Sequence, residues 1–147
     1  MTDTVRAPIR EAWTTPPTPP ATDDERAAIE ACVHDYYGSW FDGDGDRMAR
    51  ALHPALAKRA IGQGPDKATE IDESPAPEMI AATAAGRGRV RKGDRLDIRI
   101  ADSGAGIASV IAYTDHYVDY LHLILTPDGW RIINALWRWA DGHGPRA

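Results

Sequence analysis

Cysteine is nearly absent from this chain of 147 residues, because Cys32 is the only one. One cysteine can form neither an intramolecular disulfide nor a cysteine-rich zinc site. Cys32 lies at helical spacing from Ile29 and Val33, so we expect its thiol to be a small apolar group of the core rather than a nucleophile.

The chain also lacks an excess of positive charge and any long apolar run. Its formal net charge is −5 at pH 7, so it offers no basic field to the phosphates of a nucleic acid. No segment approaches the roughly 20 apolar residues of a membrane span, and none at the N-terminus has the length of a signal peptide. We therefore expect a cytoplasmic protein with neither nucleic acid nor a membrane as its partner.

Length and composition are typical of one globular domain. Hydrophobic residues make up 43% of the chain and charged residues 27%, which is close to the globular average. Residues 1–21 differ, because four prolines between Pro16 and Pro20 exclude a helix or a strand ladder. We expect a tail over residues 1–21, a domain over 22–140 and a C-terminal tail over 141–147.

A long first helix is the clearest element of the pattern. Thr22 and Glu25 have the spacing of a capping box, and Gly43 is a typical helix end. One broad apolar stripe lies between them: Ile29, Cys32, Val33, Tyr36, Tyr37, Trp40 and Phe41. An amphipathic stripe of this width predicts a helix that buries one side against the rest of the domain.

Two shorter helices follow the first. Asp44 or Asp46 can cap the second, which should end at Pro54 because the residue before a proline avoids helical geometry. The third should begin with Ser74 as its cap and end at Gly86.

From Leu96 onward the apolar spacing alternates, which is typical of strands. We expect strands at Leu96–Ile100, Ile107–Tyr113, Tyr117–Leu125 and Trp130–Trp139, and a further short strand around Ala68–Ile71 within the weakly patterned residues 55–73. The last three strands are apolar on both faces, so one face should pack on the helices and the other on a second layer or another subunit. The pattern predicts an α+β fold and a homodimer through the sheet face.

An acidic run between the first two helices resembles the start of an EF-hand calcium loop, since Asp42, Asp44 and Asp46 alternate with other residues. Arg47 stands where the loop needs glycine, and His53 stands where it needs a bidentate glutamate. We therefore expect an acidic turn and no metal site.

The order of helices and strands, with YVDYLHLIL and DGWRIINALW near the end, resembles the nuclear-transport-factor-two-like (NTF2-like) superfamily over residues 24–139. Within it the chain is most similar to the putative lumazine-binding family, a relation of SnoaL-like polyketide cyclases and ketosteroid-isomerase-like proteins. The resemblance implies a cone-shaped, curved antiparallel sheet wrapped around the long N-terminal helix with two shorter helices. It also implies a pocket between sheet and helices, and acid–base chemistry by Asp or Glu, Tyr or His without a cofactor.

The alternation in Tyr117–Leu125 separates its polar residues into two sets. Tyr117 and Asp119 share one face, and Tyr120 and His122 share the other. We expect Asp119 and Tyr117 to line the pocket and the other pair to face a partner subunit.

Asp119, Tyr36 and His53 are the catalytic candidates. Tyr36 or Tyr37 should bring one hydroxyl beside Asp119, where a desolvated carboxylate of raised pKa could take a proton next to a carbonyl while the phenol stabilises the enolate. The alternatives are a buried tyrosine–aspartate pair of structural role, and a His53 that caps the second helix.

Trp40, Tyr117, Asn134 and Trp137 are the candidates for ligand contact. Asn134 should lie among apolar core residues, where its amide could orient a carbonyl or bond the neighbouring backbone. The aromatic residues suit a small apolar or aromatic ligand.

Two functions fit this pattern. One is a small-molecule-binding domain that catalyses proton transfer, as an isomerase, dehydratase or cyclase of the lyase or isomerase class. The other is a non-catalytic homodimeric scaffold or interaction module. An open cavity that reaches Asp119 and a tyrosine hydroxyl favours the first, whereas a cone filled by Trp40 and Trp137 favours the second.

Overall fold

The computed structural model describes residues 21–61 and 70–141. Its helices are α2 (Asp23–Asp42), α3 (Gly45–Ala51), α4 (Ala76–Ala84) and the 3-10 turn η2 (Arg89–Arg91). Its strands are β1 (Leu52–Ile61), β2 (Ile71–Glu73), β3 (Leu96–Gly104), β4 (Ile107–Thr114), β5 (Tyr117–Thr126) and β6 (Gly129–Trp139). The α+β prediction is confirmed, and both expected tails lie almost wholly outside the described residues.

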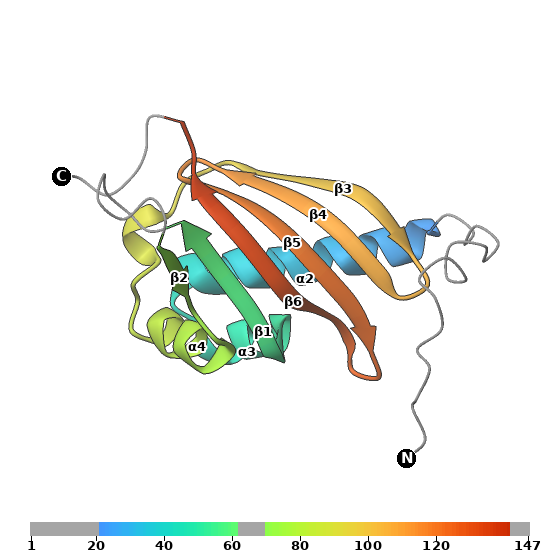
Figure 1. Cartoon of the computed structure of the whole chain (residues 1–147), viewed down its shortest axis with the longest axis horizontal. Helices are drawn as coiled ribbons and strands as arrows, with labels where there is room; N and C mark the ends of the chain where they lie inside the picture. Colours follow the sequence, from blue (N-terminus) through green and yellow to red (C-terminus); the bar gives the residue numbers. More distant parts are fainter. Residues whose placement is uncertain (1–20, 62–69, 142–147) are drawn as a thin grey trace, which may run out of the picture.

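The six strands form one curved, unclosed sheet in the order β2-β1-β6-β5-β4-β3. Helix α2 runs along one face of this sheet, with α3 and α4 beside β1 (Figure 1). All neighbouring strands are antiparallel except β1 and β6, which are parallel. The predicted antiparallel meander of β3 to β6 is confirmed. Strand β1, which the pattern does not predict, runs parallel to β6 because their connection is a long crossover through α4 and the β3–β5 strands rather than a hairpin.

Both ends predicted for α2 and the cap predicted for α3 agree with the structure. The Thr22 side chain accepts a hydrogen bond from the Glu25 N–H at 3.2 Å, and Gly43 ends α2 with a φ of 73°, where a side chain would be strained. The Asp44 carboxylate accepts the Arg47 N–H at 3.0 Å and so caps α3. These caps satisfy backbone donors that the helices themselves leave without partners.

Strand β1 is an element that the pattern does not predict. The second helix ends before Leu52, and His53 is therefore the second residue of a strand rather than a helix cap. The β1–β6 pairing is irregular between Leu52 and Ala57, and Pro54 lies in this irregular part, where its missing N–H interrupts no regular ladder. Because of this irregularity, the first half of β1 lacks the regular alternation by which a strand is recognised in a sequence.

The segment before α4 also differs from expectation. Of the short strand predicted around Ala68–Ile71, only its end is described, and Ile71 there begins β2. Pro75, rather than Ser74, precedes α4, and no side chain caps that helix. The backbone N–H of Ser74 instead bonds the carbonyl of Lys58 at 2.9 Å, which fastens this segment to β1.

A bulge in β6 decides which of its residues face the core. His122 pairs with Asn134 while Leu123 pairs with Ile132, so Ile133 is an extra residue. Ile132 is consequently buried and Asn134 exposed. The prediction that Asn134 lies among core residues is wrong, because it assumed an uninterrupted alternation.

The core lies between α2 and the concave face of the sheet. Its most deeply buried side chains include Ile29, Val33, Tyr37, Met48, Val110, Leu121, Leu123 and Ile132. None of the described helices has the length and apolar character needed to cross a bilayer.

Cys32 is buried in this core as expected, and its thiol donates to the carbonyl of Ala51 at 3.5 Å. Burial raises the pKa of the Cys32 thiol to about 12.

The thiolate is the reactive form of cysteine, so at pH 8 we expect Cys32 in the folded protein to resist alkylation by iodoacetamide. In urea the same thiol should react at the rate of a free cysteine. Mass spectrometry after a timed exposure measures both, and rapid labelling of the folded chain would contradict the buried assignment.

Candidate functional site

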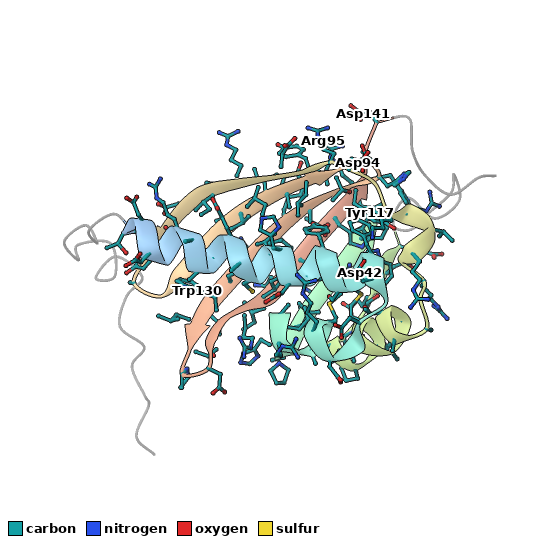
Figure 2. The ribbon with its side chains drawn as sticks, turned by 180° about the vertical axis from the view of Figure 1, so that it is seen from behind. Asp42, Asp94, Arg95, Tyr117, Trp130 and Asp141 are labelled. Atoms are coloured by element: carbon teal, nitrogen blue, oxygen red, sulfur yellow. The ribbon has the colours of Figure 1, made fainter. Side chains whose placement is uncertain are left out.

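A pocket of about 300 Å³ opens where α2 and α4 meet the sheet. Its lining consists of Tyr36, Tyr37 and Trp40 from α2; Lys58 from β1; Glu78, Met79 and Ala82 from α4; Tyr117 and Asp119 from β5; Trp137 and Trp139 from β6; and Ser74 and Arg87. Figure 2 shows Tyr117 near the end of α2 that carries Asp42, with η2 beside it. The pocket is therefore built by one end of the sheet and not by the end near Trp130.

Asp119 is the buried carboxylate of this pocket, with 2% of its surface exposed. Its Oδ2 accepts a hydrogen bond from the Tyr37 hydroxyl. Its Oδ1 is buried and has no hydrogen-bond partner in the described part of the chain. Burial raises the pKa of Asp119, while the charge of Lys58 and the Tyr37 hydrogen bond lower it to a smaller extent. The carboxylate is thus held in place through one oxygen only.

Of the two tyrosines expected beside Asp119, the one that contacts it is Tyr37 and not Tyr36, the catalytic candidate. Both side chains point into the domain because α2 lies in the curve of the sheet, and their rings meet edge to face at 4.9 Å. The Tyr36 hydroxyl instead accepts a hydrogen bond from Lys58 Nζ at 2.5 Å. Burial raises the pKa of both tyrosines well above the usual value, so both stay neutral.

Lys58 is a functional candidate that the sequence analysis misses. It is half-buried on β1, with Nζ 5.2 Å from the ring centre of Tyr36 and 5.7 Å from that of Trp137. Desolvation lowers the pKa of Lys58, and the charge of Asp119 opposes this in part. The signal that could have found it is the inward alternation of Leu56, Lys58 and Ala60.

Aromatic side chains form one wall of the pocket. The Tyr117 ring lies 5.6 Å from that of Trp137 and 5.2 Å from that of Trp139, and the two indoles lie 5.2 Å apart. The Arg91 guanidinium covers the Trp139 ring at 4.8 Å. Trp40, Tyr117 and Trp137, which the sequence analysis expects at a ligand, all line the same cavity.

Two of the expected site residues lie elsewhere. His53 is not part of the pocket lining, and its Nδ1 accepts the N–H of Ala55 at 3.0 Å. The Asn134 side chain lies on the opposite face of the sheet, with its Nδ2 3.4 Å from Nδ1 of His122. Within residues 21–61 and 70–141, no group of three or more histidine, cysteine or acidic side chains is arranged to hold a metal ion.

The assembled site combines three kinds of chemical group. Asp119 can accept a proton, the neutral phenols can donate hydrogen bonds, and Lys58 supplies an amine. Aromatic surface surrounds these groups and lowers the local dielectric, which strengthens each electrostatic interaction. An arrangement of this kind is suited to acid–base work on an aromatic ligand.

Solved structures of similar fold are described as NTF2-like or cystatin-like proteins. An NTF2-like protein of unknown function from Shewanella baltica OS155 has a TM-score of 0.65 and 16% identity, over 83% of this chain and 99% of that one. An NTF2-like protein of unknown function from Silicibacter pomeroyi DSS-3 has a TM-score of 0.65 and 19% identity, over 82% and 99%. A protein of unknown function with a cystatin-like fold from Nostoc punctiforme PCC 73102 has a TM-score of 0.61 and 10% identity, over 85% and 98%. At these identities the likeness shows the fold alone.

Among curated protein sequences, none matches this chain. The family model described as putative lumazine-binding matches residues 24–138, from the second residue of α2 to the penultimate residue of β6. That match takes in every described helix and strand, including all those that line the pocket. The chain therefore belongs to the putative lumazine-binding family, and its domain is an NTF2-like one with a cystatin-like fold.

Proposed function

We propose that this chain binds a small, predominantly aromatic molecule in the pocket, and that Asp119 moves a proton on that molecule. The reaction class is isomerisation, dehydration or cyclisation next to a carbonyl group. The family description names lumazine, a flat bicyclic heteroaromatic molecule with N–H donors, and a ligand of that general shape suits the aromatic wall.

The observation that carries the proposal is the unpartnered Oδ1 of Asp119. A buried carboxylate oxygen without a hydrogen bond destabilises the folded state. Such a group is expected where a ligand supplies the missing donor, and strongly perturbed carboxylates are concentrated at functional sites. The other oxygen is fixed by Tyr37, so the free oxygen has a defined position.

The shape of the pocket favours ligand binding over a purely structural cone. A volume of about 300 Å³ is at the lower end of the range for small-molecule sites, which is about 300–1,000 Å³. Trp40 and Trp137 border this space and leave it open. A scaffold with no ligand would gain stability by filling it, because interiors pack densely.

The proposed proton transfer uses three residues. Ionised Asp119 takes a proton from the carbon next to the ligand's carbonyl, and the electron pair moves onto the carbonyl oxygen. Tyr117 lines the same pocket as Asp119, and burial raises the pKa of Tyr117 so that it keeps its proton. The Tyr117 O–H can therefore donate to the developing oxyanion. Tyr37 keeps Asp119 in position throughout.

For the function, we expect Asp119→Asn to slow α-proton exchange in a bound aromatic ketone by about 100-fold or more, the usual contribution of a general base. Exchange is followed by proton NMR in D₂O, and binding of lumazine and of a panel of bicyclic aromatic ketones by calorimetry. Asp97→Asn is the matched control, because Asp97 is an exposed carboxylate on β3 paired with Arg95.

The two parts of this proposal fail in different ways. If no member of the panel binds, the binding proposal is wrong. If a ketone binds and Asp119→Asn exchanges its protons as fast as the unaltered chain, the pocket is real but Asp119 is not the base.

The raised pKa of Asp119 also predicts how stability depends on pH. The pKa of Asp119 is 3.8 in the unfolded chain and higher in the folded chain. The contribution of Asp119 to the free energy of unfolding is therefore fully present below pH 3.8 and is lost as pH rises through the folded pKa. Asp119→Asn removes this loss. We expect the variant to gain stability relative to the unaltered chain between pH 3 and pH 7, as measured by urea unfolding. The raised pKa of Asp119 would be contradicted if the difference in stability between the variant and the unaltered chain did not change with pH, or if the variant lost stability relative to the unaltered chain as pH rose.

We propose in addition that the outer sheet face joins two copies of the chain. Tyr120 and Leu136 are paired across β5 and β6 and are 41% and 54% exposed, with Ile111 next to Tyr120 on β4. Exposed apolar surface of this kind on a sheet is typical of a protein interface.

For the interface, Tyr120→Asp should convert a dimer into a monomer, because it places a charge in an apolar contact. Light scattering coupled to size exclusion gives the molar mass. Val90→Asp is the control, since Val90 is 83% exposed on η2, away from the sheet face. The interface proposal fails if the unaltered chain is a monomer, or if both variants remain dimers.

A further inference from the structure

Lys58 differs from an ordinary surface lysine in what surrounds its amine. Its nearest polar neighbour is the Tyr36 hydroxyl at 2.5 Å, and its other contacts are the ring faces of Tyr36 and Trp137. Across the described ranges no carboxylate forms an ion pair with it. Lys92, by contrast, is 64% exposed and pairs with Asp42 at 3.0 Å.

This environment raises the free-energy cost of protonating the amine. A desolvated ammonium without a carboxylate partner is costly, and aromatic faces return only part of that cost. Burial accordingly lowers the pKa of Lys58, which increases the unprotonated fraction at a given pH. Only the unprotonated amine has a lone pair with which to attack a carbonyl carbon.

The Lys58 amine lies where a ligand in the pocket could contact it. Lys58 lies opposite Ala135 in the β1–β6 pairing, and the next inward pair is Ala60 with Trp137. The amine therefore extends along the aromatic wall and lines the same space as Asp119. A carbonyl compound held on that wall would lie within reach of both groups.

We propose that Lys58 forms an imine with an aldehyde or ketone bound in this pocket. The nitrogen lone pair bonds to the carbonyl carbon, and the π electrons move to the oxygen. Both N–H protons then leave with that oxygen as water, so that the amine and the carbonyl compound yield the imine and one water molecule without any oxidant or reductant. The Tyr36 hydroxyl, adjacent to the nitrogen, is placed to carry a proton between nitrogen and oxygen.

The inference deepens the proposed function, since it rests on the same pocket and names carbonyl compounds as the ligand class. A protonated imine withdraws electrons more strongly than the parent carbonyl, so it makes the neighbouring C–H more acidic. Asp119 would then remove a proton from an activated carbon. Imine formation itself does not depend on Asp119 as the base.

The test is reductive trapping on the full chain with benzaldehyde and cyanoborohydride at neutral pH, followed by peptide mapping. The chain contains three lysines, Lys58, Lys67 and Lys92, so the modified site can be assigned directly. We expect Lys58 to be modified at least tenfold faster than Lys92 in the folded protein, and at an equal rate in urea. Lys58→Arg should abolish the fast modification, and Lys92→Arg should leave it unchanged.

Equal rates for Lys58 and Lys92 in the folded protein would overturn the inference, as would fast trapping that persists in Lys58→Arg. If that variant does not fold, Lys58→Met replaces it, and the rate ratio within the unaltered chain still decides. Asp119→Asn separates the two proposals: trapping at Lys58 without α-proton exchange supports the imine and the base together. In the unaltered chain, α-proton exchange without trapping at Lys58 contradicts the imine and leaves the assignment of Asp119 as the base in place.

Discussion

The hydrogen bond between Tyr37 and Asp119 is the constraint on which the site depends. It joins α2 to β5 across a separation of 82 residues in the chain, in a region where water is excluded and a lost partner would be costly. The bond fixes the height of the helix above the sheet at the pocket end. Tyr37 and Asp119 both line the pocket, so this polar contact between the two layers lies at the edge of the open space.

Two ionisable groups of opposite charge, Asp119 and Lys58, line the pocket. Asp119 and Lys58 each lower the cost of charging the other, yet each remains shifted in the direction that burial dictates. The rings of Tyr36 and Trp137 lie 5.2 and 5.7 Å from the Lys58 amine in the same pocket. Groups in this state can change protonation with a small change in surroundings, such as the arrival of a ligand.

The sequence predicts the features of this fold that depend on local chemistry. The Thr22 cap, the Gly43 end of α2 and the inward position of Asp119 each follow from side-chain type and period. Strand β1 and Lys58 are harder to predict, because the irregular pairing after Leu52 limits the alternation that identifies a strand to Leu56, Lys58 and Ala60. Whether Tyr36 or Tyr37 contacts Asp119 depends on the rotation of α2 above the sheet, which the spacing of the residues leaves open.

Because β6 contains the extra residue Ile133, its two halves contribute side chains to two different parts of the domain. Before it, Trp130 and Ile132 point into the core under α2; after it, Trp137 and Trp139 point into the pocket. In a strand with strict alternation the first pair and the second would face opposite sides. The bulge shifts the alternation by one residue, and so it brings Trp137 and Trp139 to the side of the sheet that Trp130 and Ile132 already face.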